Sequence, residues 1–224
     1  DYVYAALRQI RRELGDGKAL LGFAGSPWTL ACYLVDGGSA EGFPRTLALA
    51  RSQPAVLDRL LEILAETVAE YLRRQAEAGA DAIQIFDSWA GLLEGEDYER
   101  LSLCWIRAVL DRLPAGFPVI LYAKGKSRDA RALAATGVPV LGVDWELPLS
   151  HVRALAGRPV CLQGNLDPEW MTREPEAAAE AARAVIADNA GDPGHIFNLG
   201  HGITPEARVE TFAAVVDAVL RSGD

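Results

Sequence analysis

The sequence lacks an excess of positive charge and lacks any long apolar run. Its 224 residues hold 22 Lys and Arg against 31 Asp and Glu, which gives a net charge of −9. Nucleic-acid-binding proteins carry a basic patch or stripe, so this balance argues against a nucleic-acid partner. No apolar run approaches the roughly 18 residues that a membrane span requires. We therefore expect a soluble protein with no nucleic-acid partner, no membrane segment and no signal peptide.

Cysteine is scarce, and its three residues stand far apart at Cys32, Cys104 and Cys161. An odd, low count without a Cys-x-x-Cys pair predicts free thiols in a reducing compartment. Together with the missing membrane and export signals, this favours a cytoplasmic protein.

The chain also lacks a phosphate-binding glycine loop, but it has a regular alternation of strands and helices. Hydrophobic residues make up 50% of the chain and charged residues 24%, a globular composition. The hydrophobic spacing predicts helices and short apolar strands in turn. The predicted helices span residues 2–14, 54–78, 98–113, 127–136, 149–156, 175–189 and 205–221, and residues 43–53 could hold a short extra one. The predicted strands span residues 19–24, 80–86, 117–123, 138–143, 159–163 and 195–199. No Gly-x-Gly-x-x-Gly or Walker loop follows any of them, so a dinucleotide or P-loop site has no support.

Strands that alternate strictly with helices form a parallel sheet covered by helices. Polar, glycine-containing motifs follow the strands, which is where a (β/α)8 barrel carries its active site. Such a barrel needs eight strands and about 250 residues. Six strands in 224 residues lead us to expect that two βα units precede Asp1. An open, doubly wound sheet is the alternative, and the pattern alone leaves both open.

The motifs after the strands resemble those of the uroporphyrinogen decarboxylase family. They occur in the family's order and extend the resemblance over the whole chain. The matching segments are residues 21–30 (LGFAGSPWTL), 33–38 (YLVDGG), 86–91 (FDSWAG), 164–168 (GNLDP) and 198–203 (NLGHGI). The resemblance implies a (β/α)8 TIM barrel, with about six βα units here and a single, incomplete barrel domain over residues 1–224. It also implies a homodimer.

The activity implied by the resemblance is that of a cofactor-independent carboxy-lyase in tetrapyrrole biosynthesis. Members of the family remove carbon dioxide from the four acetate side chains of uroporphyrinogen and give coproporphyrinogen, with no metal and no organic cofactor. The family's arginine-rich segment and its aspartate that faces the pyrrole N–H groups have no match in this chain. We expect both to lie before Asp1, so the resemblance assigns no catalytic residue here. The chain alone is therefore expected to show weak activity or none.

Three residues match substrate-binding positions of the family. His201 stands between two glycines after the last strand, and as an imidazolium it could pair with a substrate carboxylate. The hydroxyl of Tyr33 could hydrogen-bond a carboxylate, and Ser88 matches a small hydroxyl residue that would add one hydrogen bond. Each has a simpler structural alternative: a cap of the loop before residue 205 for His201, packing under a loop for Tyr33, and a helix or turn cap for Ser88.

Other polar residues near the strand ends are expected to play supporting parts. Asp87 adjoins Ser88, but the family's key carboxylate lies elsewhere, so we expect Asp87 to support the site without contacting substrate. Asp167 is followed by proline, which is typical of a helix cap. Asn165 is expected to shape the same loop. The chain has only three lysines, and two of them, Lys124 and Lys126, follow one strand. Our hypothesis is that they add positive potential for a polyanion, and the alternative is a solvated loop.

Two rival functions are considered. Zinc-dependent corrinoid or coenzyme-M methyltransferases of the same superfamily carry a His-x-Cys pair after a barrel strand. This chain has residues 122–125 (YAKG) at the matching strand end, and none of its cysteines lies within two residues of a histidine. A non-catalytic chain that only binds porphyrins is the second rival, although an incomplete barrel would expose strand edges.

Overall fold

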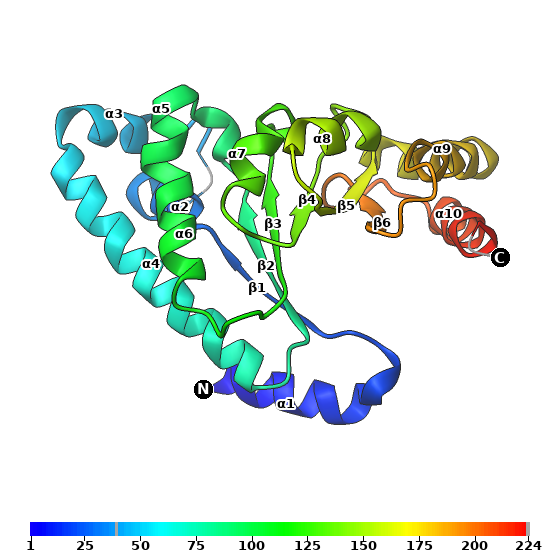
Figure 1. The fold of residues 1–224 in the computed structure, drawn as a ribbon, viewed down its shortest axis with the longest axis horizontal. Coiled ribbons are helices and arrows are strands. Elements are labelled where there is room, and N and C mark those ends of the chain that lie inside the picture. Colours follow the sequence, from blue (N-terminus) through cyan, green and yellow to red (C-terminus); the bar gives the residue numbers. More distant parts are fainter. Residues whose placement is uncertain (39, 223–224) are drawn as a thin grey trace. The chain divides into compact units, whose positions relative to one another are not determined.

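The computed structural model describes residues 1–38 and 40–222, and the chain forms two compact units, residues 1–124 and 125–224 (Figure 1). The single barrel domain expected from the sequence stays a prediction. No helix within the described residues is long and apolar enough to cross a membrane.

The first unit contains three neighbouring parallel strands, in which β1 pairs with β2 and β2 with β3. The strands are β1 (Leu21–Gly25), β2 (Ala82–Asp87) and β3 (Val119–Ala123). The helices are α1 (Tyr2–Leu14), α2 (Pro27–Asp36), α3 (Pro44–Ser52), α4 (Pro54–Glu77), α5 (Gly95–Tyr98) and α6 (Cys104–Leu110), with a π-helical segment, Glu99–Leu103, between the last two. Strand β3 is buried along its whole length, as expected of a parallel strand covered on both faces.

Helix α4 supplies much of the core of the first unit. Its apolar residues recur at helical spacing, so they share one face of the helix. That face is buried at Leu57, Leu61, Leu64, Ala65, Val68, Ala69 and Leu72. The helix packs against α2, α6 and β1, and Figure 1 shows it running alongside α2 and α6. This packing holds α2 beside the end of β1 from which it departs.

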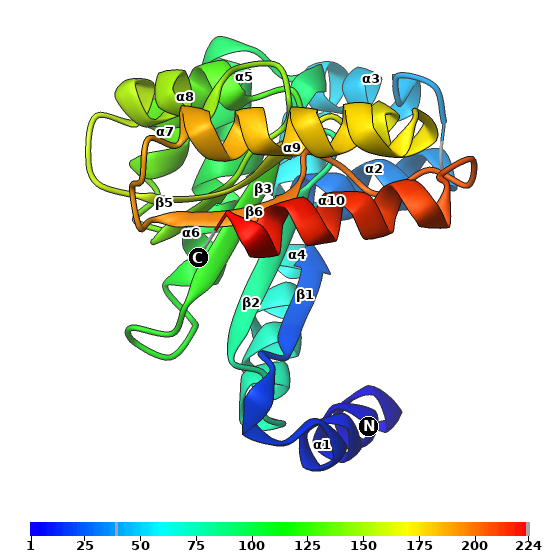
Figure 2. The same cartoon turned by 90° about the vertical axis from the view of Figure 1, so that its right-hand side faces the viewer.

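The second unit contains three further parallel strands, in which β5 pairs with β4 and with β6. The strands are β4 (Val140–Gly142), β5 (Cys161–Leu166) and β6 (His195–Leu199), and the helices are α7 (Ala130–Ala134), α8 (Leu149–Ala156), α9 (Pro175–Asp188) and α10 (Val209–Arg221). Figure 2 shows α9 and α10 side by side, in agreement with the close contacts between them. Their shared core includes Met171, Ala178, Ala182 and Val215.

The α/β class predicted from the sequence is confirmed, with three parallel strands in each unit. Two predictions need correction. Residues 27–36, for which no helix or strand was predicted, form helix α2, and the last helix begins at Val209 and not at residue 205. Apolar residues lie all around α2, since Trp28, Ala31 and Cys32 are buried while Leu34 is 63% exposed, so the sequence shows no single apolar stripe. The extra helix considered within residues 43–53 is present as α3.

The prediction of free thiols is confirmed for all three cysteines. Burial, and then the negative charge of Asp87 and Asp36, raises the pKa of the Cys32 thiol, whose residue is 0% exposed. Cys104 and Cys161 are half-buried, and burial raises the pKa of both thiols as well.

We expect Ellman's reagent at pH 8 to label Cys104 and Cys161 in the folded protein and to label Cys32 only after unfolding. The reason is that the thiolate is the reactive form, and Cys32 is both inaccessible and disfavoured as an anion. Mass spectrometry of labelled peptides checks this order. Labelling of Cys32 as fast as the other two would contradict the packing of α2.

Candidate functional site

Tyr33 lies on α2 within a cluster of aromatic rings in the first unit. Its half-buried ring meets the ring of Phe43 at a centroid distance of 5.9 Å and that of Trp89 at 6.2 Å. The rings of Phe43 and Trp89 are 4.6 Å apart. Ser88 precedes Trp89 directly in the chain, so its backbone adjoins this cluster. Edge-on ring contacts of this kind hold a phenol ring in a defined orientation.

The start of α2 explains how Tyr33 comes to lie there. Ser26 caps the helix by accepting a hydrogen bond from the Thr29 N–H at 3.0 Å, and Pro27 follows at the first helical position. Trp28 is fully buried, and its Nε1 donates to the carbonyl oxygen of Trp89 at 3.1 Å. The helix is thus tied at its first turn to the segment that carries Ser88.

Asp87 is fully buried at the end of β2, and the expectation that it supports the site without contacting substrate stays a prediction. Its Oδ1 lies 2.7 Å from Ser26 Oγ and 3.3 Å from Thr29 Oγ1, and its Oδ2 lies 2.5 Å from Ser102 Oγ. Sequence reasoning missed all three partners. The helix cap at Ser26 could have been recognised from the Ser-Pro pair, whereas nothing in the sequence marks Ser102.

The three strands of the first unit also present a row of aromatic rings. The ring of Phe86 meets Phe23 on β1 and Tyr122 on β3, each at a centroid distance of 6.0 Å. On β1 the burial alternates, and Phe23 is 61% exposed. An exposed phenylalanine on a strand offers an apolar surface to a ligand or to a further segment of protein. The sequence analysis did not single out these rings.

Lys126 is a buried residue, so the simple alternative of a solvated lysine does not hold for it. Its Nζ pairs with Asp129 at 3.0 Å, which balances part of its charge. The neighbouring loop is fixed by Asp144, whose buried carboxylate accepts hydrogen bonds from Ser127 Oγ at 2.5 Å and from the Gly125 N–H at 2.8 Å. Lys124 is half-buried. The hypothesis that both lysines attract a polyanion stays a prediction.

At the end of β5, Asp167 has the structural part expected of it, whereas Asn165 holds a different loop from the one predicted. Asp167 accepts from the Glu169 N–H at 2.9 Å and caps the short helix that begins at Pro168, so the predicted cap is confirmed. Asn165 donates to the carbonyl oxygens of Asp144 and Leu147 at 3.1 and 2.7 Å, which holds the loop after β4. A Cβ at Gly164 would lie 2.6 Å from a backbone oxygen, so only glycine fits there.

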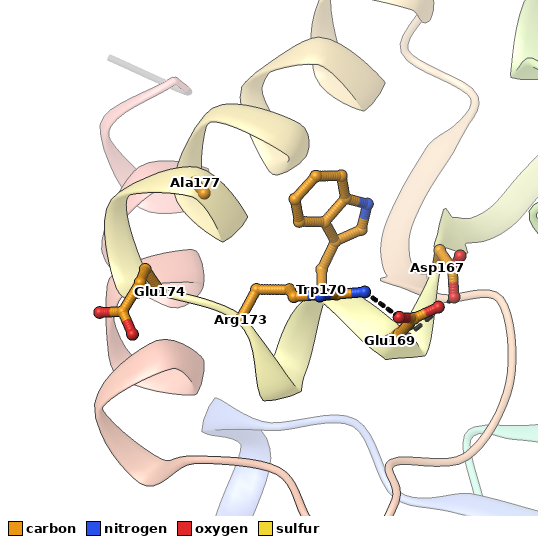
Figure 3. Close-up of a pocket in the computed structure, with 6 residues that line it drawn as sticks. All are labelled: Asp167, Glu169, Trp170, Arg173, Glu174 and Ala177. Atoms are coloured by element: carbon orange, nitrogen blue, oxygen red, sulfur yellow. Dashed lines mark hydrogen bonds and ion pairs between the residues drawn. The ribbon is translucent and has the colours of Figure 1, made fainter.

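A cavity of about 460 Å³ opens beside this segment, lined by Asp167, Glu169, Trp170, Arg173, Glu174 and Ala177 (Figure 3). Its charged groups are already engaged. Arg173 pairs with Glu169, as Figure 3 shows, and Glu174 pairs with Arg208 at 2.7 Å. None of the predicted substrate-binding residues lines this cavity.

His201 lies in the second unit, in the exposed turn after β6. A Cβ at Gly200 would lie 2.8 Å from the backbone N of Trp145, so a side chain there would collide with the neighbouring loop. The alternative that His201 caps the loop before a helix at residue 205 loses support, because α10 begins only at Val209, with Arg208 at its cap. The expectation that His201 shares one site with Tyr33 and Ser88, which lie in the first unit, stays a prediction. Within the described residues, no group of three or more His, Cys, Asp and Glu side chains could hold a metal ion.

Comparisons with known proteins point to one family. A family model described as "Uroporphyrinogen decarboxylase (URO-D)" matches residues 1–222. Curated proteins named uroporphyrinogen decarboxylase are similar over 98% of this chain, with 45% identity in Burkholderia pseudomallei (strain 1106a) and 44% in Burkholderia mallei (strain SAVP1). The chain spans 63% of the length of these relatives.

Solved structures support the fold. A methyltransferase from Methanosarcina mazei matches 99% of the chain and 64% of its own with a TM-score of 0.85 and 20% identity. A putative vitamin-B12-independent methionine synthase from Listeria monocytogenes matches 99% of the chain and 69% of its own with a TM-score of 0.66 and 14% identity. At such low identity the likeness concerns the fold alone.

Proposed function

The chain belongs to the uroporphyrinogen decarboxylase family, and on that premise we propose that the whole protein removes carbon dioxide from the four acetate side chains of uroporphyrinogen. The product would be coproporphyrinogen. The observation that carries the proposal is the match of the family model to residues 1–222, together with relatives of that name at 44% identity.

The chemistry makes three demands on the protein. Loss of carbon dioxide from an acetate arm leaves an electron pair, and a pyrrole protonated on a ring carbon can accept it as a cationic iminium. The protein must place a proton donor, stabilise this cation and orient the carboxylates. The family aspartate and arginine-rich segment have no match in this chain. We therefore assign substrate binding and orientation, and no proton transfer, to the residues of this chain.

Several side chains of this chain suit substrate binding. The hydroxyls of Tyr33 and Ser88 would hydrogen-bond substrate carboxylates, and His201 as an imidazolium would pair with another. The exposed ring of Phe23, beside Phe86, offers an apolar surface that suits the pyrrole rings. We further propose a cytoplasmic homodimer that needs no metal and no organic cofactor, as the family resemblance implies. Three free cysteines fit a reducing compartment.

The second candidate is the zinc-dependent methyltransferase, since the chain shares the fold of a methyltransferase from Methanosarcina mazei. The sequence speaks against it, since no cysteine lies within two residues of a histidine. A protein that only binds porphyrins is the third.

Anaerobic incubation of the whole protein with uroporphyrinogen, followed by chromatography, tests the proposal. We expect products with successively fewer carboxylates, ending at coproporphyrinogen. Unchanged uroporphyrinogen that co-elutes with the protein would favour porphyrin binding, and stoichiometric zinc with methyl transfer to a thiol would favour the second candidate. The 224-residue chain alone is expected to give little or no product. Full turnover by it would show that the unmatched aspartate and arginines are dispensable.

A further inference from the structure

Asp87 is a fully buried carboxylate whose partners include hydroxyl groups from separate segments of the first unit. Ser26 lies at the junction of β1 and α2, Thr29 lies in the first turn of α2, and Ser102 lies in the π-helical segment. A buried carboxylate is costly without partners, and hydrogen bonds that a carboxylate accepts from hydroxyl groups are strong. Asp87 therefore joins α2 and the π-helical segment to the end of β2.

The direction of one of these bonds follows from the geometry. Ser26 Oγ accepts the N–H of Thr29 at 3.0 Å and has a single proton to give. Its neighbour at 2.7 Å is Asp87 Oδ1, which as a carboxylate oxygen can only accept. The Ser26 hydroxyl thus donates to Asp87 while it caps α2. The carboxylate orients the group that begins the helix.

The same residue is linked to both predicted substrate-binding residues of this unit. Ser88 is its neighbour in the chain. Tyr33 lies four residues after Thr29, one turn further along the same face of α2. The ring of Tyr33 then meets Trp89, the residue after Ser88, at 6.2 Å. A shift of α2 relative to the end of β2 would therefore move Tyr33 relative to Ser88.

Because Asp87 is 0% exposed, it acts through other residues. We propose that Asp87 is a positioning residue for the decarboxylation, an inference that rests on the proposed function. Its carboxylate holds α2 against the end of β2 and so sets where the hydroxyls of Tyr33 and Ser88 meet the substrate.

Asp87→Asn in the whole protein tests this proposal, since asparagine keeps the shape and removes the charge. We expect kcat to fall roughly 10- to 100-fold with a smaller change in KM, because misplaced groups weaken binding of the transition state more than binding of the substrate. In a double-mutant cycle with Tyr33→Phe, the two losses should be less than additive, because both act through the same hydroxyl.

Two threonines provide a matched pair of variants, in which Thr29→Val tests the proposal and Thr211→Val is the control. Thr29 and Thr211 are both buried, at 2% and 0% exposure, and each hydroxyl donates one hydrogen bond, Thr29 to Asp87 and Thr211 to the carbonyl oxygen of Arg173 at 2.8 Å. Thr29→Val and Thr211→Val remove the same atoms. We expect both to lower the melting temperature, but only Thr29→Val to lower kcat. Equal loss of kcat in both would overturn the proposal, because activity would then follow stability.

Hydrogen exchange over residues 26–36 gives a readout that needs no substrate. We expect faster exchange in Asp87→Asn and unchanged exchange in Thr211→Val. If the wild-type protein is inactive, the proposed function has failed, and exchange alone decides whether Asp87 holds α2. Unchanged exchange, or unchanged kcat in Asp87→Asn, overturns the inference. If Asp87→Asn fails to fold, unchanged kcat in Thr29→Val overturns the inference.

Discussion

Replacing His201 by alanine in the whole protein is expected to lower kcat/KM for uroporphyrinogen by roughly 10- to 100-fold, the loss of a hydrogen bond to a charged group. His201 is exposed, so the change removes a potential ligand contact without emptying a core position. Its place eight residues before Val209, where α10 begins, also leaves the start of that helix intact. Steady-state kinetics under anaerobic conditions provide the measurement.

His151→Ala is the matched control for this prediction. His151 is also exposed and lies in the same unit, on α8. We expect this variant to keep the wild-type kcat/KM and both variants to keep the wild-type melting temperature. If His201→Ala turned over uroporphyrinogen as fast as His151→Ala, His201 would not bind the substrate.

Replacing Trp28 by alanine is expected to lower the free energy of unfolding by about 3–5 kcal/mol, the usual cost of truncating a buried tryptophan. Trp28 is 0% exposed and donates its Nε1–H to the Trp89 carbonyl oxygen at 3.1 Å. The change leaves a cavity and also leaves that oxygen without its indole donor. Denaturant titration of variant and wild type measures the difference.

Two comparison variants separate the parts of that loss. Trp28→Phe keeps most of the ring and removes the hydrogen bond, so its effect should be smaller. Trp145→Ala truncates a tryptophan that is 40% exposed, and its effect should be smaller again. A loss for Trp28→Ala no greater than that for Trp145→Ala would contradict the burial of α2.

The strands were the most predictable part of the fold. Short apolar runs between helical patterns gave the position of all six, and β6 begins and ends where the sequence placed it. Helix α2 was missed although Ser26, Pro27 and Gly37 are typical helix start and stop residues. Its apolar residues include the exposed Leu34 as well as the buried Trp28 and Cys32, so the sequence shows no single apolar stripe.

The site was predictable only in part. The motifs identified Tyr33, Ser88 and His201 through the resemblance, and the structure places Tyr33 in an aromatic cluster with Trp89, the residue after Ser88. The partners of Asp87 could not be predicted, because Ser102 approaches it only through the tertiary packing of a segment 15 residues away. The burial of Lys126 likewise depends on its loop, which the sequence describes only as polar.

The most direct test of the account is the amount of carbon dioxide released when the purified whole protein consumes uroporphyrinogen labelled with ¹³C in its acetate carboxyl groups. The account predicts four labelled molecules of carbon dioxide per molecule of uroporphyrinogen, together with coproporphyrinogen, and much slower release from the His201→Ala variant. Release no faster than without protein would contradict the proposed decarboxylation.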